Sequence, residues 1–270
     1  MPELPEVETT RRGLLPLLNQ TVSQVVIRNP SLRWPIPAHL VDTLKHQTLL
    51  ELGRRAKYIL ARFESGSVLL HLGMSGRICL LEKDEPPAKH DHFDLHFTDG
   101  HVLRLRDPRR FGAVLWAGKE PHKHVLLEVL GPEPLDSAFN GAWLHQQLRN
   151  KTAPIKNVIM DSHLVVGVGN IYASESLFRS GIHPQTPANK VSKSRCERLV
   201  NEIKATLNDA LQAGGSSLRD FFGTDGSPGY FQQTYFVYGR TDEPCRVCGT
   251  PIKNIRLGQR STFFCHQCQR

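Results

Sequence analysis

The spacing of the cysteines near the C-terminus restricts the fold of this part of the chain more than any other feature of the sequence. Four of the six cysteines form two pairs, Cys245-x2-Cys248 and Cys265-x2-Cys268, separated by 16 residues. Two such pairs are typical of a zinc site with four thiolate ligands. Because so short a segment cannot bury a core of its own, the metal must hold it folded. We therefore expect these cysteines to bind one structural Zn²⁺.

Disulfides and an iron–sulfur cluster are the two alternatives for these cysteines. Disulfides are typical of secreted proteins, but Glu3, Glu6 and Glu8 precede the first basic residue, so the N-terminus does not resemble a signal peptide. The other cysteines, Cys79 and Cys196, are isolated in sequence and are predicted to be reduced thiols.

Two strand-like runs lie between the cysteine pairs, Ile252 to Leu257 and Ser261 to Phe264, and Gly258 joins them. This pattern predicts a β-hairpin with Arg260 near its tip. Four protein ligands leave the zinc ion no open coordination position for chemistry. A basic hairpin on a metal-held module indicates binding in a groove.

The balance of charge points to a polyanionic partner. The 270-residue chain has a formal net charge of +8 and a pI of about 9.3, an excess typical of nucleic-acid binding. A membrane surface is the alternative, but no apolar run approaches the roughly 20 residues of a spanning helix. We expect a soluble intracellular protein.

The chain opens MPELPEVETT. Pro5 and the acidic residues suit the first turn of a helix, and the apolar spacing predicts a helix from about Pro5 to Leu18. This does not explain Pro2. Removal of Met1 would leave Pro2 with a free secondary amine, which could form a Schiff base with an opened sugar, and Glu3 could carry protons beside it.

Short alternating or apolar runs follow as far as about residue 130 and predict a β-sandwich or flattened barrel. The expected strands are Val22 to Arg28, Tyr58 to Phe63, Val68 to Leu72, Phe93 to Phe97, Val102 to Leu105 and Ala113 to Trp116. After a linker at Gly131 to Leu135 the pattern becomes helical. The expected helices are Gly141 to Arg149, Pro154 to Met160, Ile171 to Arg179 and Ser192 to Ala213.

The sequence therefore predicts an α+β fold in four parts. We expect a β-sandwich domain with its N-terminal helix at residues 1–130, a helical domain at 131–223, a mobile loop and linker at 224–242, and a zinc finger at 243–270. The loop is either a simple linker or a lid over a flipped base.

Several loops combine glycine with basic or apolar residues. Between two expected helices, DSHLVVGVGN places Asn170 where it would cap the second helix, and a helix start preceded by glycines also suits a phosphate. The loop HLGMSG exposes Met74, and DPRRFG places Phe111 beside arginines. Apolar wedges beside arginines unstack duplexes in other proteins. In RRAKY, a solvated run of charge is the alternative meaning of Lys57.

Several stretches of the chain together resemble those of a known family. They are MPELPEVET, RRAKY, HLGMSG, KHDH, DPRRFG, VVGVGNIYASE, YGR, CRVCG and GQRSTFFCHQCQ. The family that they resemble is the bacterial formamidopyrimidine-DNA glycosylases, also called 8-oxoguanine DNA glycosylases. The resemblance implies a catalytic β-sandwich, a helix-two-turns-helix domain and a zinc finger. It implies a bifunctional glycosylase and AP lyase of base excision repair that excises oxidised purines (8-oxoguanine and formamidopyrimidines) and cleaves the strand by β,δ-elimination. The implied partner is damaged double-stranded DNA in the bacterial cytosol or nucleoid, with no catalytic cofactor and no obligate protein partner, the enzyme being a monomer.

The resemblance also implies roles for individual residues. Pro2 matches the nucleophile, Glu3 the proton carrier, Lys57 the residue for β-elimination and phosphate contact, and Arg260 the residue for δ-elimination. The implied DNA-binding residues are His90, Arg109, Lys151 and Asn170, together with Met74 and Phe111, which with Arg109 fill the space left by the extruded base.

Two alternative functions stay open on the sequence alone. The first is an endonuclease VIII-like glycosylase for oxidised pyrimidines, and the second is a zinc-ribbon DNA-binding protein without catalysis. Lesion preference is open as well, because the loop from Ser217 to Gln233 varies among relatives, and Arg219 and Ser227 stand where some members have lysine.

Overall fold

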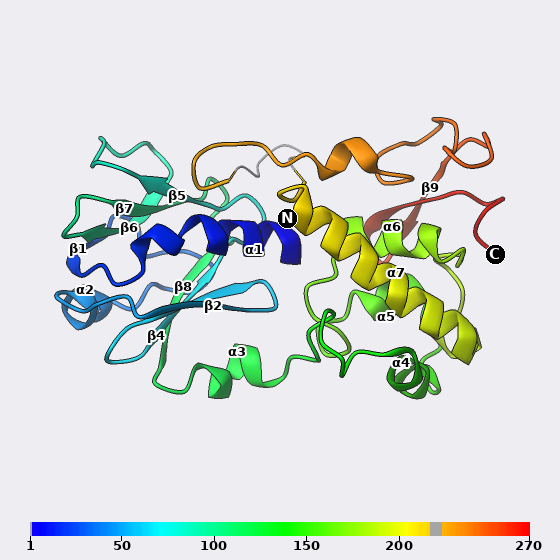
Figure 1. Ribbon diagram of the computed structural model, residues 1–270, viewed down its shortest axis with the longest axis horizontal. Helices are drawn as coiled ribbons and strands as arrows, with labels where there is room; N and C mark the ends of the chain where they lie inside the picture. Colours follow the sequence, from blue (N-terminus) through cyan, green and yellow to red (C-terminus); the bar gives the residue numbers. More distant parts are fainter. Residues whose placement is uncertain (1, 217–222) are drawn as a thin grey trace. The chain divides into compact units, whose positions relative to one another are not determined.

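The computed structural model describes residues 2–216 and 223–270, so Met1 and Arg219 lie outside the described residues. The chain divides into two compact units (Figure 1). The first is Met1–Val129 with Leu211–Gln232, and the second is Leu130–Ala210 with Gln233–Arg270. Leu211–Gln232 thus group with the N-terminal part of the chain, whereas the sequence-based division placed them in the helical domain and the loop.

The first unit contains two antiparallel four-stranded sheets, which confirms the predicted β-sandwich. One sheet has the order β1-β6-β7-β5 and the other β2-β3-β4-β8. Their strands are β1 (Val22–Ile27), β2 (Glu51–Arg55), β3 (Tyr58–Arg62), β4 (Ser67–His71), β5 (Arg77–Leu81), β6 (Asp91–Phe97), β7 (Val102–Arg106) and β8 (Ala113–Gly118). Six of them match the expected runs, whereas β2 and β5 were not among those runs. The sequence of β2, ELGRR, is too polar to signal a strand.

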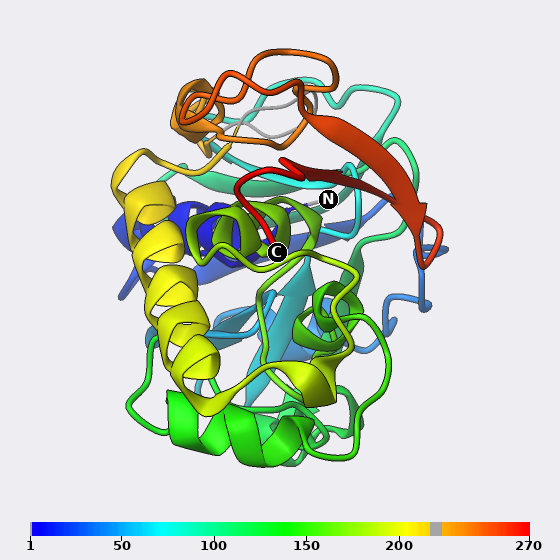
Figure 2. The same cartoon turned by 90° about the vertical axis from the view of Figure 1, so that its right-hand side faces the viewer.

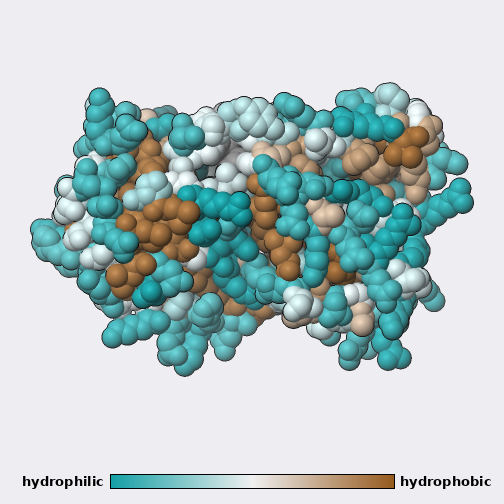
Figure 3. All heavy atoms as spheres, in the orientation of Figure 1, coloured by the Kyte–Doolittle hydropathy of each residue, from teal (hydrophilic) through white to brown (hydrophobic). Residues whose placement is uncertain are grey.

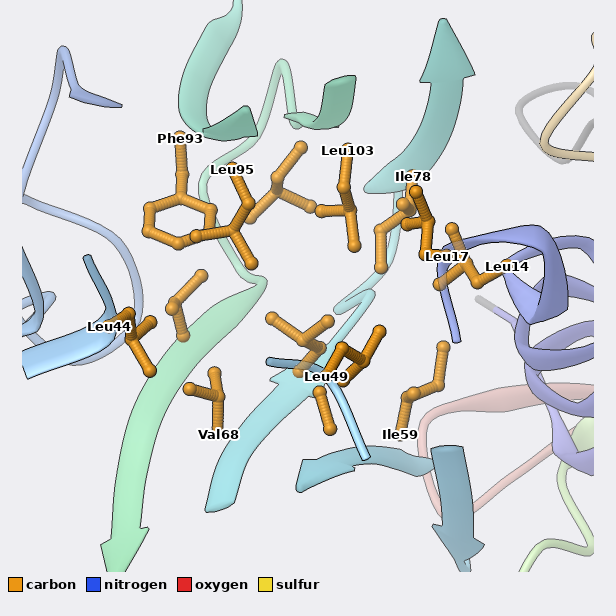
Figure 4. Packing of buried hydrophobic residues seen from close by; sticks show 14 of the residues in the cluster. Leu14, Leu17, Leu44, Leu49, Ile59, Val68, Ile78, Phe93, Leu95 and Leu103 are labelled. Atoms are coloured by element: carbon orange, nitrogen blue, oxygen red, sulfur yellow. The ribbon is translucent and has the colours of Figure 1, made fainter. Parts of the chain in front are cut away.

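Apolar side chains from both sheets meet in the interior of this unit (Figure 4). Phe93 and Leu95 come from one sheet, Ile59 and Val68 from the other, and all are at most 1% exposed. Short helix α2 (Leu40–Leu44) adds Leu44 at one end. Burying each such side chain contributes about 1.5–3 kcal/mol, so the sandwich has a core of its own.

The first helix is shorter than the sequence predicts. Helix α1 spans Leu4–Gly13, and a 3-10 turn η1 (Leu15–Leu17) follows, so the expectation of a helix to Leu18 is wrong. Glycine is a poor helix former, and Pro16 lies within the 3-10 turn. Leu14 and Leu17 remain fully buried in the core, which explains why their spacing resembles that of a longer helix.

The second unit is mainly helical, with the predicted hairpin near its end (Figure 2). Its helices lie within two residues of the expected bounds: α4 (Gly141–Leu148), α5 (Ile155–Ile159), α6 (Asn170–Arg179) and α7 (Lys193–Gln212), which runs into the first unit. The hairpin pairs β9 (Lys253–Leu257) with β10 (Arg260–Phe264). Four short elements complete the described structure: η2 (Pro121–Lys123), α3 (Val125–Glu128), η3 (Ala188–Lys190) and η4 (Phe231–Thr234).

Hydrophilic residues predominate on the face shown in Figure 3, and hydrophobic residues form separate patches. Within residues 2–216 and 223–270, the helices are too short or too polar to cross a membrane.

An ion-pair network lies in the sheet of β6 and β7. The carboxylate of Asp94 is fully buried and accepts hydrogen bonds from Arg104, 2.8 Å from Nη2 to Oδ2, and from Arg28. Arg104 is itself only 1% exposed. Burial alone would raise the pKa of Asp94, but the hydrogen bonds and charges of Arg28 and Arg104 outweigh it and hold that pKa below its usual value. The network is therefore ionised at neutral pH.

We predict that Asp94→Asn lowers the free energy of unfolding by about 3–5 kcal/mol, because it removes the buried carboxylate that pairs with the guanidinium of Arg104 at 2.8 Å. Since the pKa of Asp94 is lower in the folded state, its contribution is present above the unfolded value near pH 4 and is lost as pH falls through the folded value. Urea titrations at pH 7 and pH 3 measure both effects.

Glu120→Gln is the matched control, because its ion pair with Lys123 is mostly exposed. It should cost less than about 1 kcal/mol. Equal losses for the two variants would contradict the stabilising role of the Asp94 network.

Candidate active site and nucleic-acid interface

The backbone around Pro2 is fixed by the start of α1. Pro2 is buried and Glu3 is 2% exposed. Glu3 is the N-cap of α1 and forms a capping box with Glu6, whose Oε2 accepts the Glu3 N–H at 2.8 Å. A capping box satisfies N–H groups that the first helical turn leaves unpaired. The residue that carries the candidate amine is therefore held in place at an end of the chain, where most proteins fray.

The same Glu6 carboxylate binds a distant segment. Its Oε1 accepts the Ser216 N–H at 2.8 Å, and a Cβ added to Gly215 would lie 3.1 Å from that oxygen. Gly215 has a φ of +81°, which favours glycine. Glu6 thus connects Pro2 and Glu3 to the residues just before the loop at 217–233. From the sequence, Glu6 could be interpreted only as an acidic residue that favours the first turn of a helix, because its partner Ser216 is 210 positions away.

Lys57 lies in the two-residue turn between β2 and β3, where Arg55 pairs with Tyr58. Tyr58 pairs with His71 across β3 and β4, and their ring centroids are 4.7 Å apart. Burial, followed by the charges of Lys57 and Arg33, lowers the pKa of His71 to about 4. The imidazole is therefore neutral at pH 7.

His71 is a further candidate site residue that the sequence did not single out. Its Nδ1 accepts the Gly73 N–H at 3.0 Å, so the neutral ring carries its proton on Nε2. His71 Nε2 is thus an uncharged donor, and the nearby charges of Lys57 and Arg33 favour this neutral form of the ring. The signal in the sequence was its place as the first residue of HLGMSG.

Two loops of the sandwich expose the residues expected to act as a wedge. Met74, between β4 and β5, is 40% exposed, and Phe111, between β7 and β8, is 44% exposed. The guanidinium carbon of Arg109 lies 5.1 Å from the centroid of the Phe111 ring, within the range of a cation–π interaction. His90 is half-buried just before β6, and its ring centroid lies 6.4 Å from that of His92.

In the second unit, a buried lysine joins α6 to the hairpin. Lys156 is 1% exposed and donates to Asn170 Oδ1 at 2.6 Å, to Thr262 Oγ1 at 2.7 Å and to the Ser261 carbonyl at 3.2 Å. Asn170 Nδ2 also donates to the Ser261 carbonyl at 3.1 Å. The lysine therefore sets the position of the hairpin strand on α6.

The expectation that Asn170 caps α6 is wrong. The N-cap is Gly169, and Asn170 is the first residue of the helix, with its side chain held by Lys156 and Ser261. Sequence position alone suggested a cap because asparagine is favoured there. The contact with Ser261, 91 residues away, draws the side chain away from the helix N-terminus.

The remaining basic residues of the expected site also lie in the second unit. Lys151 is half-buried after α4. Arg260 is exposed as the first residue of β10, paired with Leu257 beside the turn. The structure thus places Asn170, Lys156 and the hairpin in this unit. The other candidate residues belong to the first unit and are Pro2, Glu3, Lys57, Met74, His90, Arg109 and Phe111.

A buried carboxylate anchors the segment that leads into the hairpin. Glu175, on α6, is 1% exposed and accepts the backbone N–H groups of three successive residues, Phe236, Val237 and Tyr238, at 2.8–3.0 Å. No pattern in the sequence indicated this contact. Phe178, which is also on α6, packs in one hydrophobic cluster with Val237, Ile252 and Phe263.

The four cysteine sulfurs are arranged for one metal ion. They all lie within 4.8 Å of one another, with Sγ atoms 3.9 Å apart for Cys245 and Cys268 and 3.5 Å apart for Cys248 and Cys265. A tetrahedron with Zn–S bonds of about 2.3 Å has edges of about 3.8 Å. Disulfide sulfurs would be about 2.0 Å apart. The donor set and spacing fit a closed thiolate site, as the sequence predicts.

Three family models match the chain in consecutive order. They are described as the formamidopyrimidine-DNA glycosylase N-terminal domain over residues 1–114, the formamidopyrimidine-DNA glycosylase H2TH domain over residues 130–222, and a zinc finger found in FPG and IleRS over residues 242–270. The last match identifies the four-cysteine module as a zinc finger and confirms zinc as the expected metal.

Relatives named formamidopyrimidine-DNA glycosylase span the whole chain. The protein of Methylobacillus flagellatus is 72% identical over 270 residues, covering 100% of this chain and 97% of the relative. That of Aromatoleum aromaticum is 56% identical over 271 residues, with 100% of both chains covered.

Solved structures agree with this match over the full fold. The MutM (Fpg) protein of Thermus thermophilus is 38% identical, with a TM-score of 0.90 over 99% of this chain and 98% of that chain. Lactococcus lactis Fpg in complex with DNA containing an abasic site is 33% identical, with a TM-score of 0.92 over 99% of each chain. The family models, the identities and the fold together show that this chain belongs to the formamidopyrimidine-DNA glycosylase family.

Proposed function

We propose that the chain removes oxidised purines, 8-oxoguanine and formamidopyrimidines, from double-stranded DNA through the secondary amine of Pro2, and then cleaves the strand. The observation that carries this proposal is the buried position of Pro2 directly before the Glu3–Glu6 capping box. Members of the family have been solved with DNA that contains Fapy-dG or an abasic site. Relatives named formamidopyrimidine-DNA glycosylases disfavour the pyrimidine-directed alternative and the non-catalytic one.

The chemistry begins with an unprotonated amine, which requires that Met1 has been removed. The Pro2 nitrogen attacks the anomeric carbon, the glycosidic bond breaks, and the base leaves with the bonding electrons. Glu3 transfers a proton as the sugar ring opens to an iminium ion. The iminium acidifies the C2′–H, and loss of that proton gives an enamine that expels the 3′ phosphate (β-elimination). Loss of the C4′ proton then expels the 5′ phosphate (δ-elimination). Lys57 serves the first elimination and contacts phosphate, and Arg260 serves the second.

The described contacts support these assignments of DNA-binding residues. In the first unit, the charges of Lys57 and Arg33 act on His71 and, together with its burial, keep it neutral. In the second, Lys156 holds Asn170 against the hairpin, next to the phosphate-binding start of a helix that glycines precede. Lys151 and His90 complete the proposed phosphate contacts, and the net charge of +8 suits a DNA backbone.

Met74, Arg109 and Phe111 form the proposed wedge. Extruding a base costs a few kcal/mol, and an exposed apolar side chain beside a guanidinium can take its place in the stack. The loop at 217–233 is the proposed reader of the flipped base, and Glu6 binds Ser216, the residue directly before it.

We assign the chain four domains and place it in the bacterial cytosol or nucleoid as a monomer. They are the catalytic β-sandwich at 1–130, the helix-two-turns-helix domain at 131–223, the base-recognition loop and linker at 224–242, and the zinc finger at 243–270. The zinc is structural because four thiolates close its coordination sphere, and the reacting centre needs no cofactor.

We predict that Pro2→Gly reduces single-turnover base excision by about 100-fold or more, because a flexible primary amine replaces a constrained secondary one. Quenched-flow cleavage of an 8-oxoguanine duplex measures this rate, while a gel-shift titration should show binding within about threefold of wild type. Pro5→Ala is the control, because it changes a proline in the same segment and leaves the amine intact. Wild-type excision by Pro2→Gly would exclude Pro2 as the nucleophile.

We expect Lys57→Ala to slow strand cleavage and weaken DNA binding modestly. Loss of one phosphate contact should reduce the slope of log K against log salt by about 1. Titrations between low and moderate salt measure the slope, and Lys45→Ala, an exposed lysine after α2, should leave it unchanged. If Lys57→Ala matched wild type in both slope and lyase rate, Lys57 would be only a solvated surface charge.

Removal of zinc should weaken DNA binding by about 100-fold or more, because the hairpin that carries Arg260 depends on the metal for its fold. The far-ultraviolet circular dichroism should change little, since the sandwich has its own core and the metal-held hairpin contributes only two short strands. Readded Zn²⁺ should restore binding, and Cys79→Ser should bind zinc and DNA normally. Full activity after complete zinc removal, or melting of the whole protein with the ion, would contradict this account.

A further inference from the structure

The carboxylate of Asp107 lies beneath the two loops that carry Met74, Arg109 and Phe111. Asp107 is fully buried. Its Oδ1 accepts the Ser75 hydroxyl at 2.8 Å and the Arg109 N–H at 3.2 Å, and its Oδ2 accepts the Gly112 N–H at 2.7 Å. Ser75 directly follows Met74, and Phe111 lies between the other two donors. A single carboxylate thus binds both loops next to each of the three exposed side chains.

Glycines let the two loops touch backbone to backbone. A Cβ added to Gly73 would lie 2.3 Å from the Phe111 carbonyl carbon, and one added to Gly112 would lie 3.0 Å from Asp107 Oδ2 and 2.9 Å from the His71 carbonyl oxygen. Gly73 also has a φ of +60°, a conformation that favours glycine. The loops therefore form one rigid body around the carboxylate.

The backbone of Asp107 extends these contacts to a third segment. Its N–H donates to the His90 carbonyl at 2.9 Å, and its carbonyl oxygen lies 2.8 Å from His92 Nε2. His90 is a proposed phosphate contact. The backbone and side chain of one residue therefore link every wedge residue to a DNA-binding position.

We propose that Asp107 is the positioning residue for base extrusion, which holds Met74, Arg109 and Phe111 in place before DNA arrives. This inference rests on the proposed function and extends it to a residue that touches neither substrate nor reacting atoms. Exposed side chains gain little order from a core, so the backbone beneath them must supply it. Order already present in the free protein reduces the entropy lost on binding, and extrusion needs wedge residues in register with the unstacked base.

Asp107→Asn tests the proposal because it preserves size but removes one acceptor. The amide nitrogen of asparagine cannot accept a hydrogen bond. In one orientation of the amide the bond from the Gly112 N–H is lost, and in the flipped orientation the bonds from Ser75 and Arg109 are lost. We expect excision of 8-oxoguanine from duplex DNA to fall by about tenfold or more, and cleavage of a preformed abasic site in single-stranded DNA to stay within about twofold. The fluorescence rise of 2-aminopurine opposite the lesion, which reports unstacking, should fall in parallel.

Three variants separate positioning from folding. Ser75→Ala should cause a smaller loss of the same kind, Ser75→Thr should recover much of it, and Asp99→Asn, a partly exposed aspartate bound to His101, should behave as wild type. Urea unfolding of each variant identifies any that is unfolded under assay conditions. Should Asp107→Asn itself be unfolded, the Ser75 pair carries the test.

Two results would overturn the inference. One is wild-type excision from duplex by Asp107→Asn and Ser75→Ala, and the other is an equal loss on duplex and on single-stranded abasic DNA, which indicates a general structural role. Borohydride trapping on abasic DNA distinguishes a wrong role for Asp107 from a wrong proposed function. Wild-type protein that does not trap would refute the Schiff base chemistry, whereas trapping by wild type with no substrate split in Asp107→Asn would refute only the role of Asp107.

Discussion

The contact between the Glu6 carboxylate and the Glu3 N–H is the constraint on which the proposed chemistry depends. A nucleophile at a chain terminus needs an ordered terminus, and here the capping box of α1 provides it. The other oxygen of Glu6 binds Ser216, so the same carboxylate that orders Pro2 also holds the residue that directly precedes the proposed base-reading loop. One buried side chain therefore connects the amine and the proposed reader of the damaged base.

The other parts of the proposed DNA-binding site follow the same principle, because buried polar groups fix the positions of exposed side chains. Lys156 is hidden beneath Asn170 and the hairpin, Glu175 anchors the chain that leads to the zinc finger, and Asp107 lies beneath the wedge. Each of these groups is almost fully buried and bonded to several partners. Such networks specify one arrangement because an unmade hydrogen bond in the interior is costly. Binding residues can then stay exposed without being disordered.

Most of the secondary structure and the zinc ligands could be predicted from the sequence, whereas the long-range contacts that hold the loops could not. Alternating apolar residues located most strands, and the cysteine spacing identified the metal ligands. The length of α1 was overestimated because Leu14 and Leu17 keep helical spacing after the helix ends. Asn170 was misassigned as a cap because its partners, Lys156 and Ser261, are distant in sequence. The role of Glu6 was missed for the same reason, since no local pattern encodes its contact with Ser216.

Identification of the atom that bonds to the sugar tests the central claim most directly. The protein would be reduced with borohydride while bound to a duplex containing 8-oxoguanine, digested, and the DNA-linked peptide sequenced by mass spectrometry. The account predicts that the adduct lies on the N-terminal peptide, at the nitrogen of Pro2, with Met1 absent. An adduct on Lys57 or another lysine, or a modified chain that retains Met1, would contradict it.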